Sequence, residues 1–439
     1  MDSTTPGHRL AVLGGGATGV TAAGWLARRF GAQVDLFEAS PTLGGLHKSV
    51  ALCGRDYDVG AFVFDPAHDL FQVFPELAED FIAIEAQFRR VTPSGALDIY
   101  PISIGGYIRD VGLSRATVSF VDFMLAKLRY RQRASVAEYA SYCMGRRIYE
   151  DSGLKNYIER LYSRPDHEVD LDFALQRLRY IEQLTLSRAL RSVLQRMMRG
   201  HGGDQAVKVM IRPPGGFGAC YGKVQTLLEA AGVQIFASTR LQSVRSLGEG
   251  RFEVQSDQFT RCYDGLISTI PVADALRLLG CKPQGNYETV TLVTLFYRSK
   301  VLFAGDFIYN FTFEGRWKRI TVFSRMYREA DVVDRYAVEI PIRQGEPITV
   351  EALQSAFEAH ALQLGLVSGR PERVGSYTTE RAYPVFLDGK TSGVAHDRAM
   401  AQSLGIRLAG RQGTFAYLSS AESAAQGKQV VHRWASERP

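Results

Sequence analysis

The N-terminal part of the chain alternates between apolar runs and a helical pattern of apolar positions. Residues 10–13 form a short apolar run of the length expected for a buried strand. Residues 20–30 then place apolar side chains at the spacing of an amphipathic helix, which ends at Gly31. A second apolar run, 33–37, follows directly. This order predicts a strand–helix–strand unit with two parallel strands.

The turn between the first predicted strand and the helix reads Gly-Gly-Gly-Ala-Thr-Gly, from Gly14 to Gly19. In a dinucleotide-binding fingerprint, Gly14 permits the tight turn, Gly16 lets backbone approach a pyrophosphate, and Gly19 lets helix and strand pack closely. Ala17 and Thr18 open the helix, whose N–H groups and dipole favour an anion. The complete strand–turn–helix context favours a bound dinucleotide over a glycine-rich turn without a ligand.

An acidic residue, Glu38, ends the second predicted strand, about 20 residues beyond the glycines, where a carboxylate can bond both hydroxyls of an adenosine ribose. The next loop carries a second glycine pair, Gly44 and Gly45, before Leu46. This pair resembles the extended fingerprint of FAD enzymes of the amine oxidase superfamily, in which the glycines carry the chain along the pyrophosphate. The resemblance implies FAD. His47 either approaches the cofactor or substrate or is a loop histidine.

Helical patterns dominate the next part of the chain, and strand patterns return after it. Apolar spacing predicts helices over 114–129, 135–144, 148–162 and 171–198, and a later one over 219–231.

Strands are expected over 56–64, in a hairpin of 241–246 with 251–256, over 265–270, and repeatedly within 287–342. This order predicts an α/β fold with a Rossmann-type (GR2-like) FAD-binding domain, a helical insertion and an antiparallel β-sheet substrate domain. The expected boundaries are 1–60, 212–285 and 400–439 for the discontinuous FAD-binding domain, 100–205 for the helical insertion, and 61–99 with 286–399 for the substrate domain.

The composition narrows the class of protein. With 439 residues, 46% hydrophobic and 22% charged, the chain is typical of a soluble globular protein. No apolar run reaches the roughly 18 residues of a membrane-spanning helix, and the first ten residues lack an apolar signal region. Five scattered cysteines without metal-ligand spacing indicate reduced thiols, no metal site and a cytoplasmic location.

Arginine is dense between residues 129 and 199, although the net charge is only +6. Acidic residues interleave with these arginines, so most of them are interpreted as a solvated helix face with i,i+4 partners. Because arginine binds phosphate groups bidentately, a second interpretation is that one or two reach an anionic substrate. We expect no nucleic-acid partner.

Five segments carry a resemblance that covers nearly the whole chain. The sequence resembles the FAD-binding amine oxidase superfamily, and within it the branch of UDP-galactopyranose mutase and the protoporphyrinogen-oxidase-like enzymes of polysaccharide gene clusters. The segments are 14–49, the Tyr-Asp-Val-Gly-Ala run that contains Gly60, 144–150 with Tyr157, 214–218, and the Gly-Arg-Gln-Gly-Thr-Phe-Ala-Tyr run over 410–417.

The last segment also has a physical rationale. A predicted strand over 406–409 stops at Gly410, which lets backbone approach the flavin, and a helix from about Ser420 offers its N-terminus to the isoalloxazine carbonyls. The resemblance to the mutases implies that Arg411, beside the cofactor, and Tyr417 contact a substrate diphosphate. The alternatives are a surface ion pair for Arg411 and simple packing for Tyr417.

Two local features bear on the chemistry. Tyr383, in an Ala-Tyr-Pro segment like that of the family, lines the sugar pocket or else packs in a loop. Where the mutases have a histidine facing the flavin, this chain reads Gly-Ala-Phe-Val-Phe-Asp over 60–65. After Tyr417 it reads Leu-Ser-Ser-Ala instead of the mutase Asn/Asp-Met-Asp.

Two chemistries follow from the resemblance. In the first, N5 of the reduced flavin attacks the anomeric carbon of a nucleotide sugar, and pyranose and furanose forms interconvert. In the second, the flavin accepts a hydride from an amine or a C–C bond, as in the amine and protoporphyrinogen oxidases. The branch motif and the arginine-rich insertion favour the first, and the missing histidine favours the second. A flavin-bound binding module is a third interpretation, and a homodimer is compatible with the sequence.

Overall fold

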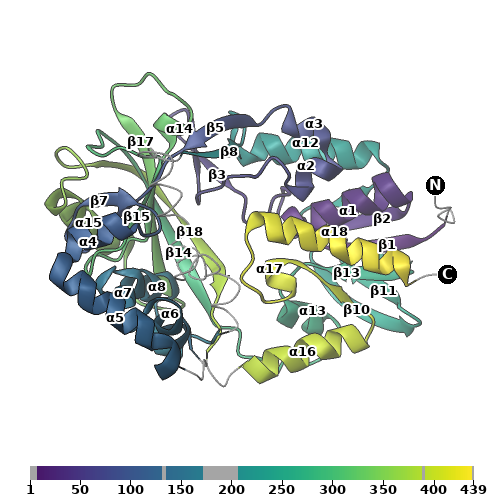
Figure 1. Cartoon of the computed structure of the whole chain (residues 1–439). Helices are drawn as coiled ribbons and strands as arrows, with labels where there is room; N and C mark the ends of the chain where they lie inside the picture. Colours follow the sequence, from purple (N-terminus) through teal and green to yellow (C-terminus); the bar gives the residue numbers. More distant parts are fainter. Residues whose placement is uncertain (1–6, 131–134, 172–205, 388–390, 438–439) are drawn as a thin grey trace, which may run out of the picture.

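The structure is a computed structural model, and it describes residues 7–130, 135–171, 206–387 and 391–437. Two lobes are visible in Figure 1, each built around its own β-sheet, and the two ends of the chain lie beside the same lobe. No helix in these ranges is long and apolar enough to cross a bilayer.

The lobe that holds both ends of the chain is built on a parallel sheet. Each of its strands pairs in parallel with its neighbours. The N-terminal strand–helix–strand unit forms as predicted, with helix α1 (Ala17–Phe30) between the first two strands and Gly31 at its C-cap in the left-handed conformation. In sheet order the strands are β19 (Arg407–Leu408), β13 (Gly265–Ser268), β1 (Arg9–Leu13), β2 (Gln33–Phe37) and β9 (Gln234–Phe236).

Successive residues of β1 pack into different cores. Leu10 and Val12 join the core shared with α1, α12 (Gly216–Ala230) and α18 (Ser420–Ser436). Ala11 and Leu13 join the core on the opposite face of the sheet. Because side chains alternate along a strand, one apolar run supplies both cores. The second core is covered by β10 (Leu241–Gly248), β11 (Arg251–Ser256), β12 (Thr260–Tyr263), α13 (Val272–Leu278) and α16 (Thr391–Ser403).

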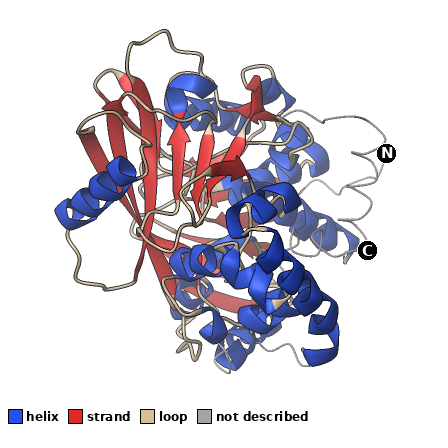
Figure 2. Ribbon diagram, turned by 60° about the vertical axis from the view of Figure 1, so that its left-hand side comes forward, coloured by secondary structure: helices blue, strands red, loops and turns tan. Residues whose placement is uncertain are grey.

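The other lobe contains a seven-stranded sheet, whose strands run side by side in Figure 2 with helices on both faces. All its pairings are antiparallel except that of β6 with β15. One face packs on α15 (Val350–Gln363) and the other on the helical part of the lobe. In sheet order the strands are β18 (Glu372–Pro384), β14 (Thr289–Ser299), β17 (Asp334–Arg343), β16 (Arg319–Val322), β15 (Phe307–Asn310), β6 (Phe88–Val91) and β7 (Leu97–Ile99).

The helical insertion forms, but its third predicted helix is interrupted. The prediction of one helix over 148–162 is wrong, because the chain breaks at Ser152 and Gly153. Gly153 has a φ of +77°, and a Cβ there would lie 1.8 Å from the carbonyl oxygen of Phe311. The predicted helix 171–198 lies outside the described residues except for its first residue. The described helices are α4 (Ile104–Val111), α5 (Leu113–Arg129), α6 (Val136–Met144), α7 (Arg146–Asp151) and α8 (Leu154–Tyr162).

The predicted strand over 56–64 is also shorter than expected, because β4 (Arg55–Asp58) ends before Gly60. Beyond it Thr294 donates to the carbonyl of Val59, and the N–H of Ala61 donates to Glu339. Backbone pairing resumes only at Phe64, which forms an isolated bridge with Met210. The other elements are β3 (Ser49–Leu52), α2 (Asp69–Val73), α3 (Pro75–Ala78), β5 (Ile82–Ala86), η1 (Asp166–Glu168), β8 (Val207–Ile211), α14 (Phe323–Met326) and α17 (Gly410–Gly413).

Candidate functional site

The glycine-rich turn after β1 is held against the ends of β1 and β2. Gly14 has a φ of +99°, and its N–H donates to the carbonyl of Phe37 at 2.8 Å. A Cβ on Gly19 would lie 1.8 Å from the carbonyl oxygen of Gly14. The turn therefore needs glycine at both positions, because one requires a left-handed backbone and the other leaves no space for a side chain.

The start of α1 has the features of an anion site. Gly16 is the N-cap and supplies no side chain, and the first turn contains no acidic residue. The N–H groups of Ala17 and Thr18 therefore lie at a helix N-terminus where a pyrophosphate is favoured. The second glycine pair lies alongside: Gly44 forms a bridge with Gly16, and a Cβ on Gly45 would lie 3.0 Å from the Cα of Gly16. The two glycine segments thus form one narrow backbone cradle.

Glu38 closes this cradle at the end of β2. Its Oε2 accepts the N–H of Gly15, and its Oε1 accepts the N–H of Ser40, both at 2.7 Å. A carboxylate has about four lone-pair positions, so each oxygen can accept a further hydrogen bond from a ribose hydroxyl. The half-buried carboxylate is thus oriented by the glycine turn itself. Its remaining acceptor positions fit the hydroxyl donors of a ribose.

The C-terminal segment meets the same cradle. Gly410 has a φ of +81°, and a Cβ there would lie 2.5 Å from Oγ1 of Thr18 in the first turn of α1. A short helix, α17, begins at this glycine, and α18 begins at Ser420 as predicted. The N-terminus of α18 is closed by a capping box between Ser419 and Glu422, so part of its N–H groups already have partners.

Arg411, the residue after Gly410, lies against the rings of two tyrosines. Arg411 Nε donates to the carbonyl of Leu418 at 2.9 Å, and its Nη1 donates to the carbonyl of Ala382 at 3.0 Å. The guanidinium carbon lies 5.5 Å from the ring centroid of Tyr383 and 5.4 Å from that of Tyr417. Arg411, Tyr383 and Tyr417 are therefore together, at the end of β18 and in the loop before α18, and both tyrosine rings are buried.

A buried ionic cluster lies behind Tyr383, and the sequence analysis missed it. Lys318 Nζ donates to the Tyr383 hydroxyl at 2.9 Å and lies 2.6 Å from Oε2 of Glu339. Arg319 Nε donates to Oε1 of Glu339 at 2.9 Å. The N–H of Ala61 donates to the same oxygen at 3.2 Å. Two cations, one carboxylate and the segment after Gly60 are thus joined in one network.

Burial and neighbouring charges shift the pKa values of the side chains in this cluster. Burial alone would raise the pKa of Glu339, but the charges of Arg319 and Lys318 outweigh it and lower the pKa to about 2. Burial lowers the pKa of Lys318, although Glu339 opposes that shift. Arg411 lies against the ring of Tyr383, whose hydroxyl Lys318 bonds, so the cluster and Arg411 together hold three cationic side chains and one carboxylate, a positive excess that favours an anionic ligand.

His47 is buried among aromatic rings. Its Nδ1 lies 2.7 Å from the Tyr221 hydroxyl, and its ring stacks on Phe217 with centroids 5.1 Å apart. Phe62 and Phe64 approach it edge-on, so the segment after Gly60 contributes apolar rings at this place. Burial is the main reason that the pKa of His47 is lowered to about 3, which keeps the imidazole neutral.

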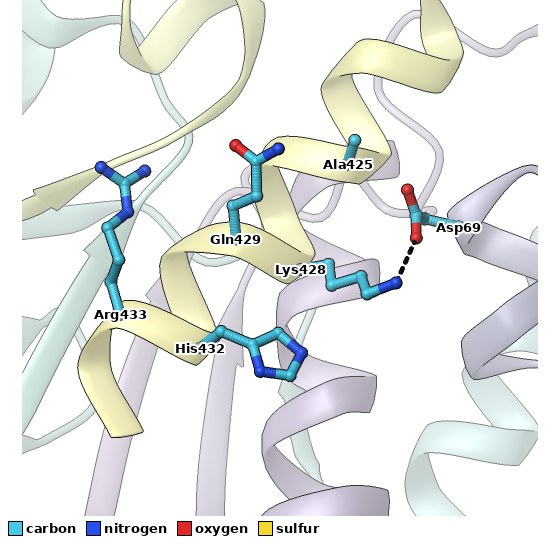
Figure 3. A pocket seen from close by; sticks show the side chains of 6 residues that line it. All are labelled: Asp69, Ala425, Lys428, Gln429, His432 and Arg433. Atoms are coloured by element: carbon cyan, nitrogen blue, oxygen red, sulfur yellow. Dashed lines mark hydrogen bonds and ion pairs between the residues drawn. The ribbon is translucent and has the colours of Figure 1, made fainter. Parts of the chain in front are cut away.

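One surface hollow is separate from these residues. A pocket of about 460 Å³ lies between α18 and α2, where Lys428 Nζ lies 3.0 Å from a carboxylate oxygen of Asp69 (Figure 3). It shares no lining residue with the glycine cradle or the tyrosine pair. Within the described residues, no three His, Cys, Asp or Glu side chains are grouped as metal ligands.

A family model described as an NAD(P)-binding Rossmann-like domain matches residues 12–77. The match includes both glycine segments and Glu38, and it confirms the predicted Rossmann-type domain. No curated protein matches the sequence.

Solved structures share the fold over almost the whole chain. Reduced UDP-galactopyranose mutase is 17% identical with a TM-score of 0.80, and the alignment covers 99% of this chain and 95% of the mutase. A protein from Exiguobacterium sp. described as a protoporphyrinogen oxidase is 17% identical with a TM-score of 0.72, covering 99% and 100%. Putrescine oxidase bound to putrescine is 13% identical with a TM-score of 0.60, covering 98% and 99%.

The chain thus shares its fold, over almost its whole length, with a mutase and with oxidases. At these identities the likeness establishes the fold, and the substrate has to be argued from the site.

Proposed function

We propose that this protein is a FAD-dependent enzyme that acts on a nucleotide sugar, in the manner of UDP-galactopyranose mutase. The observation that carries the proposal is the adjacency of Gly410 and Arg411. Gly410 lies against Thr18 at the start of the dinucleotide cradle, and Arg411 lies in the tyrosine pair. One loop therefore joins the cofactor cradle to a cluster with a positive excess.

The cradle supports FAD through its backbone. The N–H groups of Ala17 and Thr18 would hold the pyrophosphate, and Glu38 would accept the ribose hydroxyls. Gly44 and Gly45 leave space for the chain to follow the pyrophosphate. The purified protein is expected to be yellow and to release non-covalent FAD on denaturation. A colourless protein that takes up no FAD on reconstitution would overturn the cofactor assignment.

The proposed binding of the substrate rests on the charged and aromatic side chains around Arg411. Arg411 would bond a diphosphate, while the rings of Tyr383 and Tyr417 pack beside it and exclude water. Lys318 orients the Tyr383 hydroxyl by hydrogen bonding to it, and Glu339 fixes that ammonium. The reduced cofactor, when bound, supplies the nucleophile for the anomeric carbon of the sugar. These side chains bind and orient the substrate, so no paired acid and base is required of them.

Dithionite-reduced protein incubated with UDP-, GDP- and dTDP-linked sugars tests this proposal directly. We expect one nucleotide class to bind, as measured by flavin fluorescence, and the matching pyranose and furanose forms to interconvert. Failure of all three nucleotides to bind at millimolar concentration would overturn the nucleotide-sugar assignment and leave the cofactor assignment intact.

A second candidate is a FAD-dependent oxidoreductase of the amine oxidase or protoporphyrinogen oxidase type. The apolar segment after Gly60 favours it, because Phe62 and Phe64 surround His47 with rings and present no polar side chain of their own there. Such a wall suits hydride transfer from an apolar or amine substrate to flavin. Oxidised protein that reduces its flavin with amines or porphyrinogens, and consumes oxygen, would establish this candidate in place of the first.

A further inference from the structure

His47 is attached to the glycine cradle through both its backbone and its side chain. Its N–H donates to the carbonyl of Gly44 at 3.0 Å, so a tight turn leads from the second glycine pair to the imidazole. Its Nδ1 lies 2.7 Å from the hydroxyl of Tyr221. The ring of Tyr221 in turn lies against Gly44, where a Cβ would be 2.9 Å from Cδ2 of that ring. The imidazole is therefore held in one place beside the backbone of the cradle.

Two observations place this imidazole near the C-terminal segment that meets the cradle. Burial is the main reason that the pKa of His47 is lowered, and the charges of His68 and Arg411 lower it further, so both side chains are close. Phe64 contacts both histidine rings, with centroid distances of 5.5 Å to His47 and 5.1 Å to His68. His68 Nε2 lies 3.1 Å from Oγ of Ser420, the first residue of α18. Because the N-terminus of α18 is the expected neighbour of the isoalloxazine carbonyls, His47 lies toward the flavin end of the cradle.

The hydrogen bond to Tyr221 determines which imidazole nitrogen carries the proton. Burial raises the pKa of the Tyr221 hydroxyl well above its ordinary value, so this group keeps its proton. Within the described ranges, His47 is the only hydrogen-bond partner of that hydroxyl. If Nδ1 carried the imidazole proton, the phenol proton would be buried without an acceptor, which is unfavourable. Tyr221 is therefore the donor and Nδ1 the acceptor, and the proton of the neutral imidazole lies on Nε2.

The N–H group at Nε2 then has no acceptor in the part of the chain that the structure describes. His47 is only 6% exposed, and the rings of Phe62, Phe64 and Phe217 around it carry no hydrogen-bonding atom. Nε2 is nevertheless not one of the polar atoms that the described residues seal off without a partner, so it still reaches open space. Buried polar groups are normally hydrogen-bonded. An oriented donor without an acceptor therefore indicates that a ligand supplies one.

We propose that the Nε2–H group of His47 donates a hydrogen bond to a ring carbonyl of the bound flavin. This inference rests on the proposed FAD cofactor and not on the proposed substrate. Reduction places negative charge on the ring carbonyls, and a hydrogen bond to a charged acceptor is stronger than one to a neutral acceptor. The same donor therefore binds the reduced cofactor more tightly than the oxidised one. His47 thus raises the reduction potential of the flavin, which favours the reduced form that the mutase reaction requires.

Nitrogen-15 NMR of the FAD-loaded protein, labelled at histidine, tests the position of the proton. His360 is an internal reference, because its Nδ1 accepts the indole N–H of Trp317 at 2.9 Å and an indole nitrogen can only donate. We expect His47 to show the same protonation pattern as His360, with its signals assigned by their loss in His47→Phe. Reduction with dithionite should shift the Nε2–H signal of His47, because its acceptor gains charge, and should leave that of His360 unchanged.

The reduction potential of the bound flavin measures the consequence. The double variant His47→Phe/Tyr221→Phe removes the imidazole and the hydroxyl together, so neither group is left buried without its partner. Its preference for reduced over oxidised FAD should fall about tenfold, which for a two-electron couple lowers the midpoint potential by about 30 mV. Tyr221→Phe is the matched control. It keeps the imidazole and its Nε2–H group, so its midpoint potential should stay close to that of wild type.

Several results would overturn the inference. One is an imidazole proton on Nδ1, and another is an Nε2–H signal that does not respond to reduction of the flavin. Equal midpoint potentials for the double variant and Tyr221→Phe would show that His47 only packs in the core, and if the double variant does not fold, the NMR result decides. A protein that holds no FAD would overturn the cofactor assignment together with this inference, whereas a failure to bind nucleotide sugars would leave the inference intact.

Discussion

Tyr383 stacks on Tyr417, with ring centroids 5.2 Å apart and ring planes 15° apart. The two rings come from the end of β18 and from the loop before α18, so their contact joins the large sheet to the C-terminal segment. Arg411 lies within 5.5 Å of both centroids and bonds backbone carbonyls of both segments. Its guanidinium is therefore oriented before any ligand arrives, which limits the entropy lost on binding.

Arg411→Ala should weaken binding of the nucleotide by roughly 1.5–3 kcal/mol, the scale of a charged hydrogen bond. Arg411→Lys should restore only part of this, because an ammonium cannot reproduce the planar fork or its stacking on the rings. UDP titration followed by flavin fluorescence measures both. Arg407→Ala is the control, because Arg407, in β19, pairs with the exposed Glu437 at the end of α18 and its loss should leave the Kd unchanged. Equal Kd values for wild type and Arg411→Ala would remove the phosphate role of this residue.

Glu38→Ala should deplete FAD from the purified protein while the fold persists. The variant loses an acceptor for the ribose hydroxyls, at a cost of roughly 2–4 kcal/mol if both charged hydrogen bonds are lost. It also releases the N–H of Gly15, so the glycine turn itself loses a partner. FAD content per chain, compared with an exposed-carboxylate control such as Glu79→Ala, measures the effect. Unchanged occupancy would mean that the ribose is held elsewhere.

The arrangement of the glycine segments around the start of α1 could be predicted because its signals are local. Gly14, Gly16, Gly19 and Glu38 fall within one strand–helix–strand unit, and each has a conformational or chemical reason to be what it is. Gly410 was found in the same way, from a strand that stops at a glycine. Gly410 lies against Thr18, so the N-terminal and C-terminal parts of the chain meet at this point. A local sequence pattern in each part was therefore enough to predict both sides of the contact.

The ionic cluster could not be predicted because it depends on strand register. Arg319 lies directly opposite Glu339 across β16 and β17, and sequence alone does not fix that pairing. A usable signal was nevertheless present. Glu339 stands inside the apolar run of β17, and a lone carboxylate in a buried strand requires a cationic partner. The break at Gly153 was missed for a similar reason, because the carbonyl of Phe311 that excludes a side chain there is distant in sequence.

Glu339→Gln should destabilise the protein strongly. The change leaves Lys318 and Arg319 buried without their carboxylate, which costs about 3–5 kcal/mol for a broken buried pair. Chemical denaturation measures the free energy of unfolding. Glu253→Gln, which breaks the exposed pair with Arg245, should cost no more than about 1 kcal/mol. Similar losses for the two variants would show that the cluster contributes no more than a surface pair.

The same carboxylate predicts an acid limit to stability. The pKa of Glu339 is about 2 in the folded protein against an ordinary value of 4.5. Its stabilising contribution is therefore complete above pH 4.5 and is lost as the pH falls from 4.5 toward 2. Glu339→Gln should remove this part of the pH dependence, so the unfolding free energies of variant and wild type should converge in acid.

His47 predicts a loss of stability at higher pH than any carboxylate does. Its pKa is about 3 in the folded protein against an ordinary value of 6.5, so between these values only the unfolded chain binds the proton. The stability contribution is complete above pH 6.5 and falls as the pH drops, by up to about 1.4 kcal/mol per pH unit. His68, with a pKa lowered to about 4 mainly by burial, adds a second contribution of the same sign.

His47→Gln isolates the first contribution, because glutamine keeps a hydrogen-bonding group for the Tyr221 hydroxyl and does not titrate. Unfolding free energies measured between pH 6.5 and 5, above the main carboxylate range, should fall less steeply for this variant than for wild type. His396→Gln changes an exposed histidine and should keep the wild-type slope. The slopes decide the question even if His47→Gln lowers overall stability through lost stacking on Phe217. Parallel curves for wild type and His47→Gln would show that the buried imidazole accepts its proton in the folded protein as readily as in the unfolded chain.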